Sequence, residues 1–156
     1  MHLWLVRHGE AEAYQSNDEL RALTVKGRQD IHALAAKLQQ WQVQPQRILV
    51  SPYLRAQQTL SILQAQNAWS QAAELSEHIT PDASMSDCLQ LLEGNKSTLM
   101  VSHQPLVSLL LAMLIDGHAR YAYDYPMNPG SIACVRLDAW QAGAAHLEFL
   151  YSPPYD

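Results

Sequence analysis

The sequence predicts an α/β fold, a sandwich of helices around a largely parallel β-sheet that has an antiparallel edge at the C-terminus. Short apolar runs alternate along the chain with segments whose apolar residues recur at helical spacing. Two β-like runs, 131–137 and 145–151, then follow each other around a loop that contains Gly143. Because no linker, repeat or low-complexity tract interrupts the pattern, we expect a single domain over residues 1–156.

The chain begins with an apolar run that predicts a buried strand. Residues 2–6 form this run, and it ends abruptly at the polar turn Arg7-His8-Gly9. Thr24 is then a plausible helix N-cap. Behind it, apolar residues at helical spacing predict an amphipathic helix lying on the sheet; they are Ile31, Leu34, Ala35, Leu38 and Trp41.

The next elements repeat the order of strand and helix. Residues 47–50 predict a second strand, and Ser51-Pro52 predicts a helix start with serine as the cap and proline as the first helical residue. Arg55 then lies in the first turn, and the buried face of this helix carries Ala56, Leu60 and Leu63. A short strand at 73–75 follows, and beyond Pro81 a helix is indicated by Met85, Cys88, Leu89 and Leu92.

The third clear strand has the same plan as the first. Residues 97–102 form an apolar run that ends just before His103. Pro105 then opens an apolar helix over residues 106–115.

Composition narrows the class of protein. The chain has 156 residues, 48% of them hydrophobic and 16% charged, which excludes a disordered or collagen-like chain. The formal net charge of -5 argues against a nucleic-acid partner. The longest apolar stretch, 106–115, is about half of what a bilayer span needs, and the N-terminus lacks a signal-peptide pattern. We therefore expect a cytoplasmic protein without membrane association, and buried reduced thiols at Cys88 and Cys134.

Residues suited to phosphoryl chemistry follow three of the predicted strands. In open α/β sheets the ligand lies beyond the carboxyl ends of the strands, where Arg7-His8, the segment 51–55 and His103 would meet. Arginine forks and helix N-termini favour a small dense anion such as a phosphoryl group. We expect Arg7 and Arg55 to clamp the anion and unprotonated His8 to be the nucleophile, its pKa lowered by the neighbouring arginines. His103 would donate to a phosphoryl oxygen.

Each of these residues also has a simpler interpretation. The Arg7-His8-Gly9 tripeptide can be an ordinary strand-end turn, Arg55 a solvated helix residue and His103 a satisfied histidine near the core. Their joint occurrence at strand-to-helix junctions of one sheet favours a site.

Four motifs resemble those of a known family. The segments are Leu5-Val6-Arg7-His8-Gly9-Glu10, Leu23-Thr24-Val25-Lys26-Gly27, Val50-Ser51-Pro52-Tyr53-Leu54-Arg55-Ala56-Gln57-Gln58-Thr59 and Val101-Ser102-His103. In this order they are similar to the histidine phosphatase, or phosphoglycerate-mutase-like, superfamily. The short length and the run Ser-His-Gln-Pro-Leu-Val at 102–107 resemble its SixA-type phosphohistidine phosphatases.

The resemblance implies roles for individual positions. His8 matches the histidine that is transiently phosphorylated, Arg7, Arg55 and His103 match the remaining phosphate-pocket residues, and Arg21 matches a further arginine near the pocket. A surface arginine is an equal interpretation of Arg21. The implied fold is a three-layer α/β/α sandwich without a large lid insertion, and the implied enzyme needs no metal or cofactor. Its implied partner is the phosphohistidine of a histidine-containing phosphotransfer domain of a sensor kinase in two-component signalling, and we expect a monomer.

The chain departs from larger relatives in its proton donor and in its short loops. Gln104 follows His103 at the position where many relatives have an acidic residue. Glu77 is a candidate for the proton donor, but an ordinary surface glutamate is an equal interpretation. Because the N–P bond of phosphohistidine is labile, its cleavage depends less on a dedicated proton donor. The loop 116–129 leaves little chain for a lid, so Tyr121, Tyr123 and Tyr125 either line the rim or pack the loop.

Two alternatives remain beside the phosphohistidine phosphatase. One is a phosphatase of small phosphate esters, which turnover of sugar phosphates would favour. The other is a phosphohistidine-binding adaptor without turnover, which the presence of His8 disfavours.

Overall fold

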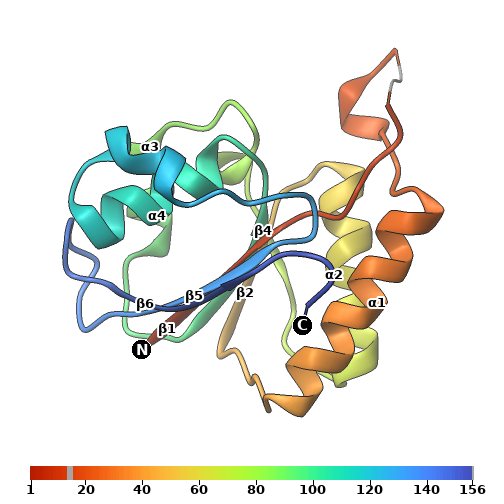
Figure 1. The fold of residues 1–156 in the computed structure, drawn as a ribbon, viewed down its shortest axis with the longest axis horizontal. Helices are drawn as coiled ribbons and strands as arrows, with labels where there is room; N and C mark the ends of the chain where they lie inside the picture. The colour runs from red at the N-terminus through yellow and green to blue at the C-terminus, as the bar shows by residue number, and fades with distance from the viewer. Residues whose placement is uncertain (14–15, 156) are drawn as a thin grey trace.

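The computed structural model of this protein describes residues 1–13 and 16–155, and its centre is a six-stranded sheet (Figure 1). The strands are β1 His2–Arg7, β2 Arg47–Val50, β3 Glu74–Leu75, β4 Thr98–Ser102, β5 Ile132–Arg136 and β6 His146–Tyr151. Their order is β3-β2-β4-β1-β5-β6; the first four are parallel, and β5 and β6 pair antiparallel at one edge. The predicted α/β class with its antiparallel C-terminal edge is confirmed.

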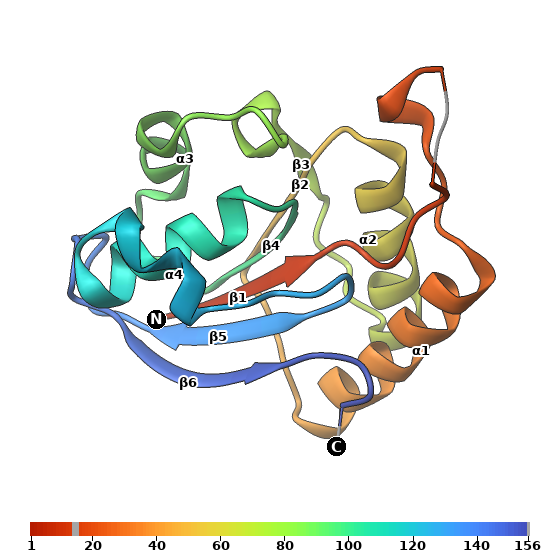
Figure 2. The same cartoon turned by 45° about the horizontal axis from the view of Figure 1, so that its top comes forward.

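Helices cover both faces of the sheet and make three layers (Figure 2). On one face lie α1 Val25–Gln40 and α2 Leu54–Asn67, and on the other α3 Met85–Leu92 and α4 Leu106–Asp116. Within β4, Leu99 and Val101 pack toward α1 and α2, whereas Met100 packs toward α3 and α4. This alternation, with every residue of β4 buried, is what a strand covered on both faces requires. In the part of the chain described, no helix has the length and apolar character needed to span a membrane.

The first helix begins where the sequence predicts. The Thr24 hydroxyl accepts a hydrogen bond from the Gly27 N–H at 2.9 Å, which caps the helix. The predicted apolar positions are buried, with one exception. Trp41 is not on the buried face, because α1 ends at Gln40; its ring instead lies beside Phe149 and Tyr151 of β6, with ring centroids 5.1 and 5.6 Å away.

The predicted start of the second helix is wrong. Neither Ser51 nor Pro52 opens it; α2 begins at Leu54, with Tyr53 as a cap that makes no side-chain hydrogen bond. The Ser51 hydroxyl accepts from the Tyr53 N–H at 3.3 Å and also lies 2.7 Å from Nε2 of His103. The Ser51 hydroxyl, which the local pattern predicts to cap the helix, therefore has a distant partner, His103, just after the end of β4.

A close approach between α1 and the loop after β1 fixes the turn that carries His8. A Cβ on Gly27 would lie 2.1 Å from the carbonyl oxygen of Glu10, so only glycine fits there. The same carbonyl accepts the Thr24 N–H at 3.0 Å. The helix start thereby holds the residues that follow His8 in place.

Two other predictions concern α4 and the cysteines. α4 begins at Leu106 directly after Pro105, as predicted, and it ends at Asp116, one residue beyond the predicted end. Both cysteines, Cys88 and Cys134, are free and buried, as predicted.

Candidate active site

The carboxyl ends of β1, β2 and β4 bring the predicted residues together. The Arg55 Nε–H points at Nε2 of His8 at 3.2 Å, and the rings of His8 and His103 have centroids 5.0 Å apart. The backbone N–H of His8 also donates to the Ser102 carbonyl at 3.1 Å, which joins the end of β1 to the end of β4. Side chains 47 and 95 residues apart in sequence from His8 thus share one pocket because parallel strands end at the same edge.

His8 is buried, and its two ring nitrogens have different surroundings. Nδ1 lies 2.8 Å from the carbonyl oxygen of Gly9, so Nδ1 carries the ring proton and donates a hydrogen bond to that oxygen, while Nε2 is unprotonated and accepts from the Arg55 Nε–H. The pKa of His8 is lowered to about 4, chiefly by burial and secondarily by the positive charges of Arg55, Arg7 and Arg21. The Gly9 carbonyl opposes this shift. The direction matches the prediction from the sequence, but desolvation outweighs the arginines as its cause.

His103 is also buried and neutral near physiological pH. Its pKa is lowered to about 2 by burial first, then by the charge on His8 and on Arg55. Nε2 lies 2.7 Å from the Ser51 hydroxyl, and Nδ1 has no hydrogen-bond partner among the described residues. If the Ser51 hydroxyl donates to Nε2, the ring proton resides on Nδ1 and is available to a ligand oxygen.

The two arginines are held from different sides. Arg7 donates from Nη1 to the Met127 carbonyl at 2.8 Å. Arg55, 4% exposed, donates from Nη1 to the Asp18 carbonyl at 2.8 Å and pairs through Nη2 with the Asp18 carboxylate at 3.3 Å. The guanidinium of Arg55 also lies over the Tyr53 ring, 4.9 Å from its centroid. Both guanidinium groups are therefore oriented before any ligand binds.

Two buried nitrogens in this pocket lack partners. Over residues 1–13 and 16–155, the buried side-chain nitrogen and oxygen atoms without a hydrogen bond are Nε of Arg7 and Nδ1 of His103. An unpaired buried donor costs about 1–3 kcal/mol, so native structures rarely keep one without a reason. Both belong to side chains that the sequence predicts to bind a phosphoryl group, and an oxyanion would satisfy both.

Comparison with known proteins gives the family. The model of the histidine phosphatase superfamily (branch 1) matches residues 3–80. Phosphohistidine phosphatase SixA of Escherichia coli (strain K12) is 34% identical, over 98% of this chain and 94% of that protein. This chain belongs to the histidine phosphatase superfamily.

Further matches place the chain near the SixA proteins of the superfamily. The SixA homolog of Haemophilus influenzae is 41% identical, over 73% of this chain and 77% of that protein. A solved structure of the protein histidine phosphatase SixA complexed with tungstate superposes with a TM-score of 0.87 at 31% identity, covering 99% of this chain and 98% of that one. The resemblance inferred from the four motifs is confirmed, as is the fold that it implied.

Arg21 is linked to Arg55 through Asp18. Its Nε donates to the Glu12 carbonyl at 2.7 Å, and its Nη1 pairs with the Asp18 carboxylate at 3.0 Å. Asp18 in turn holds Arg55, so Arg21 is one step removed from His8 in the pattern of contacts. Its charge still contributes to the lowered pKa of His8.

The sequence did not predict Asp18 as a pocket residue, and it predicted Ser51 at the strand end but in a different role. Asp18 lies in a polar loop, where its only signal is a position three residues before Arg21, the spacing of an ion pair on a helical turn. Ser51 was visible at a strand end, but it was assigned to a helix cap.

The remaining predicted residues lie outside this hydrogen-bonded group. Glu77 is exposed at the start of a 3₁₀ helix, Glu77–Ile79, and its carboxylate makes no hydrogen bond or ion pair with the described residues. A 3₁₀ helix, Ala119–Asp124, carries Tyr121 and Tyr123. Tyr123, 97% exposed, lines a groove of about 480 Å³ that starts at Gln104, the residue after His103. Tyr121, Tyr125 and the pocket residues Arg7, His8, Arg55 and His103 are not among the residues lining this groove.

Proposed function

We propose that this protein removes the phosphoryl group from phosphohistidine on another protein, through a phospho-His8 intermediate. The client that we propose is the phosphotransfer domain of a sensor kinase in a cytoplasmic two-component relay, and the enzyme acts on it as a single-domain monomer. One observation carries the proposal: a buried, neutral His8 has an unprotonated Nε2 beside Arg55, in the pocket where Arg7 and His103 keep unpaired nitrogens.

The relatives support this choice of substrate. Two SixA proteins that match over most of this chain carry the name phosphohistidine phosphatase, and the SixA structure holds tungstate, a tetrahedral oxyanion. An oxyanion of this shape requires several N–H donors converging on one point, which the two arginines and His103 supply.

The first chemical step uses the hydrogen bonds described above. The lone pair on Nε2 of His8 attacks phosphorus in line, and the bond between phosphorus and the client imidazole breaks. The Gly9 carbonyl oxygen accepts a hydrogen bond from the Nδ1–H of His8 and so holds the ring in the reactive tautomer. Arg7, Arg55 and His103 bind the equatorial oxygens, where the charge of the transferring group is spread.

The second step returns the enzyme to its starting form. Water attacks the phosphorus of phospho-His8, inorganic phosphate leaves, and the electron pair of the N–P bond returns to Nε2.

The leaving client imidazole needs one proton in the first step. Asp18 is a poor donor, because its hydrogen bond with Arg21 and the charge on Arg55 lower its pKa and keep it ionised near neutral pH. An imidazole is basic enough to take this proton from water.

The test is phosphate release from a phosphohistidine-bearing phosphotransfer domain. Wild type and His8→Ala are compared in EDTA, with a sugar phosphate as second substrate and Glu77→Gln as a variant outside the pocket. We expect the His8→Ala variant to lose at least about a thousandfold in turnover. Wild type should also form an acid-labile phosphoenzyme that His8→Ala lacks.

The outcomes separate the alternatives. Preference for the sugar phosphate would remove the proposed substrate and leave a phosphatase of small esters. Tight binding of the phosphorylated domain without phosphate release would indicate the adaptor. Equal turnover in wild type and His8→Ala would overturn His8 as the nucleophile.

A further inference from the structure

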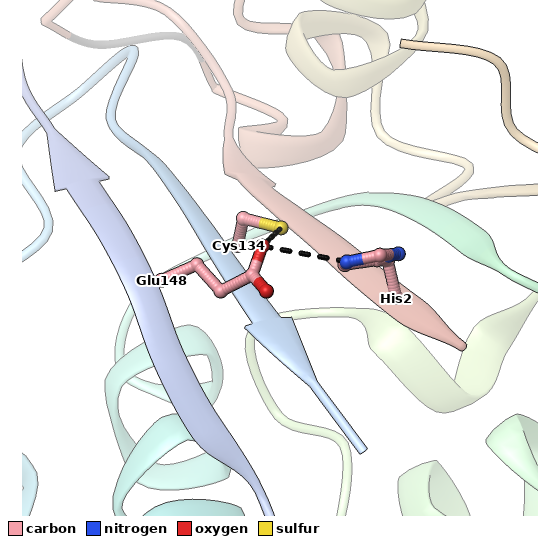
Figure 3. A group of neighbouring side chains, drawn as sticks. All are labelled: His2, Cys134 and Glu148. Atoms are coloured by element: carbon pink, nitrogen blue, oxygen red, sulfur yellow. Dashed lines mark hydrogen bonds and ion pairs between the residues drawn. The ribbon is translucent and has the colours of Figure 1, made fainter. Parts of the chain in front are cut away.

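A second group of reactive side chains lies at the opposite end of the strands from His8. His2 of β1, Cys134 of β5 and Glu148 of β6 point toward one another across three neighbouring strands (Figure 3). His2 begins the strand whose far end carries His8, and six residues of strand span about 20 Å. The group is therefore separate from the phosphoryl pocket.

A β-bulge creates this group. Cys134 pairs with Phe149, but Val135 pairs with Leu147, so Glu148 is an extra residue in β6. In regular alternation a residue beside Phe149 would face the other side of the sheet. The bulge re-aims Glu148 to the side of Cys134, whose thiol lies 3.8 Å from Oε2 of the glutamate.

The third side chain is also held in orientation. The His2 ring stacks on Trp4 with centroids 5.5 Å apart, and its Nε2 lies 3.3 Å from Oε2 of Glu148. The other carboxylate oxygen, Oε1, pairs with Arg136 at 3.4 Å. One oxygen thus faces the histidine and cysteine, while the second is fixed by an arginine outside the group.

We propose that His2, Cys134 and Glu148 bind a zinc ion that joins β1, β5 and β6. The three ligand atoms lie within 4.8 Å of one another. With usual bond lengths to zinc, the edges of a tetrahedron are about 3.3 Å between nitrogen and oxygen and about 3.6 Å between sulfur and oxygen. The observed separations of 3.3 and 3.8 Å come close to these values. The third pair, Nε2 of His2 and Sγ of Cys134, lies within 4.8 Å, against about 3.6 Å in a tetrahedron, so these two side chains would close on the ion.

The chemistry of the ligands favours zinc over magnesium or calcium. A thiolate and an imidazole bind borderline metals such as zinc, whereas magnesium and calcium prefer oxygen ligands throughout. On binding, the S–H bond of Cys134 breaks, the proton passes to solvent and a Zn–S bond forms; no electron is transferred. One thiolate and one carboxylate then balance the charge of Zn²⁺, and Arg136 remains on the free oxygen of Glu148 as an outer partner.

The exposure of the three side chains indicates how the zinc ion would reach them and what it would do. Cys134 is 1% exposed, but His2 and Glu148 are more than a third exposed and border solvent, which opens a path for the ion. Since β6 is an edge strand, a bond from it across β5 to β1 would stabilise the sheet edge. The ion would act on stability and not on the phosphoryl transfer at His8.

The experiment titrates untagged, reduced, metal-free protein with Zn²⁺ against a chromophoric chelator. We expect one zinc per chain, and at least about a hundredfold weaker binding in Cys134→Ser, His2→Ala and Glu148→Gln. Matched controls are Cys88→Ser, the other buried thiol, and His146→Ala on β6; both should bind as wild type does. Zinc at about a hundred times Kd should raise the wild-type Tm by about 5–10 °C and leave that of Glu148→Gln unchanged.

Cobalt(II) gives a readout that does not depend on folding stability. Its thiolate charge-transfer band should appear with wild type and with Cys88→Ser, and be absent with Cys134→Ser. Circular dichroism checks that each variant is folded. Absence of stoichiometric zinc binding, or zinc binding that survives Cys134→Ser and is lost in His8→Ala, would overturn the proposal.

Discussion

Replacing Asp18 by asparagine should strengthen the binding of oxyanions. The Asp18 carboxylate pairs with Arg55 and Arg21, so it occupies part of the guanidinium that a phosphoryl group needs. Its negative charge also reaches the pocket, where it acts to raise the pKa of His103. The asparagine variant keeps the backbone carbonyl that accepts from Nη1 of Arg55, so the arginine should stay in place.

The magnitude follows from the exposure of the pair. The Arg55 side chain is 5% exposed, but the Asp18 side chain is 55% exposed and well screened by water. Ion pairs of this kind are worth about 0.2–1 kcal/mol, which corresponds to roughly a 1.5- to 5-fold change in an equilibrium constant. We therefore expect the Kd for tungstate or inorganic phosphate to fall by about 1.5- to 5-fold at low ionic strength.

The assay is isothermal titration of wild type and Asp18→Asn with tungstate at two salt concentrations. Glu19→Gln is the matched control, because Glu19 is exposed in the same 3₁₀ helix, Asp18–Leu20, and forms no ion pair with the described residues. The control should change the Kd by less than about twofold, and added salt should reduce the gain in Asp18→Asn. An unchanged or weaker affinity of Asp18→Asn for tungstate would refute the idea that the Asp18 carboxylate competes with the oxyanion for Arg55. Asp18 would then serve to position Arg55.

Three further predictions concern single groups in or near the pocket. Because the pKa of His8 is about 4, the rate of phosphoenzyme formation should be flat above pH 5 and decline as the pH drops through about 4, measured by rapid quench. The folded-state pKa values of His8 and His103 lie below 6.5, so the unfolded chain binds protons first and the urea midpoint should decrease as pH falls from about 6.5. Ser51→Ala should lower kcat by about tenfold through loss of the His103 tautomer, with Ser51→Thr restoring activity in the same assay; full activity in Ser51→Ala would contradict this. Glu77→Gln should change turnover on the phosphohistidine protein by less than about threefold, whereas a thousandfold loss would make Glu77 the required acid.

The order of elements was accessible from sequence because it depends on local pattern. Buried strands such as Thr98–Ser102 are short apolar runs, and the Thr24 cap needs only the residues of the following turn. The end of a strand can be placed in the same way, so the meeting of Arg7-His8 with His103 followed once the sheet was assumed to be parallel.

Predictions failed where a side chain has a distant partner. Ser51 has the local features of a helix cap, yet its hydroxyl lies against His103, which is 52 residues away. Trp41 continues the helical spacing of α1, but the helix ends one residue earlier and the ring lies beside β6. In both cases a tertiary contact outweighs a local preference of modest energy.

The sequence by itself determined the fold class, the family and the main residues of the pocket. Strand ends, helix caps and motifs each depend on a few consecutive residues, so they can be recognised without the tertiary structure. Tertiary structure decided the properties that depend on surroundings. Burial, more than the arginines, keeps His8 neutral, and the fold pairs Arg55 with Asp18. A single bulge in β6 brings Glu148 to Cys134 and His2, because side-chain direction in a sheet changes with a register shift of one residue.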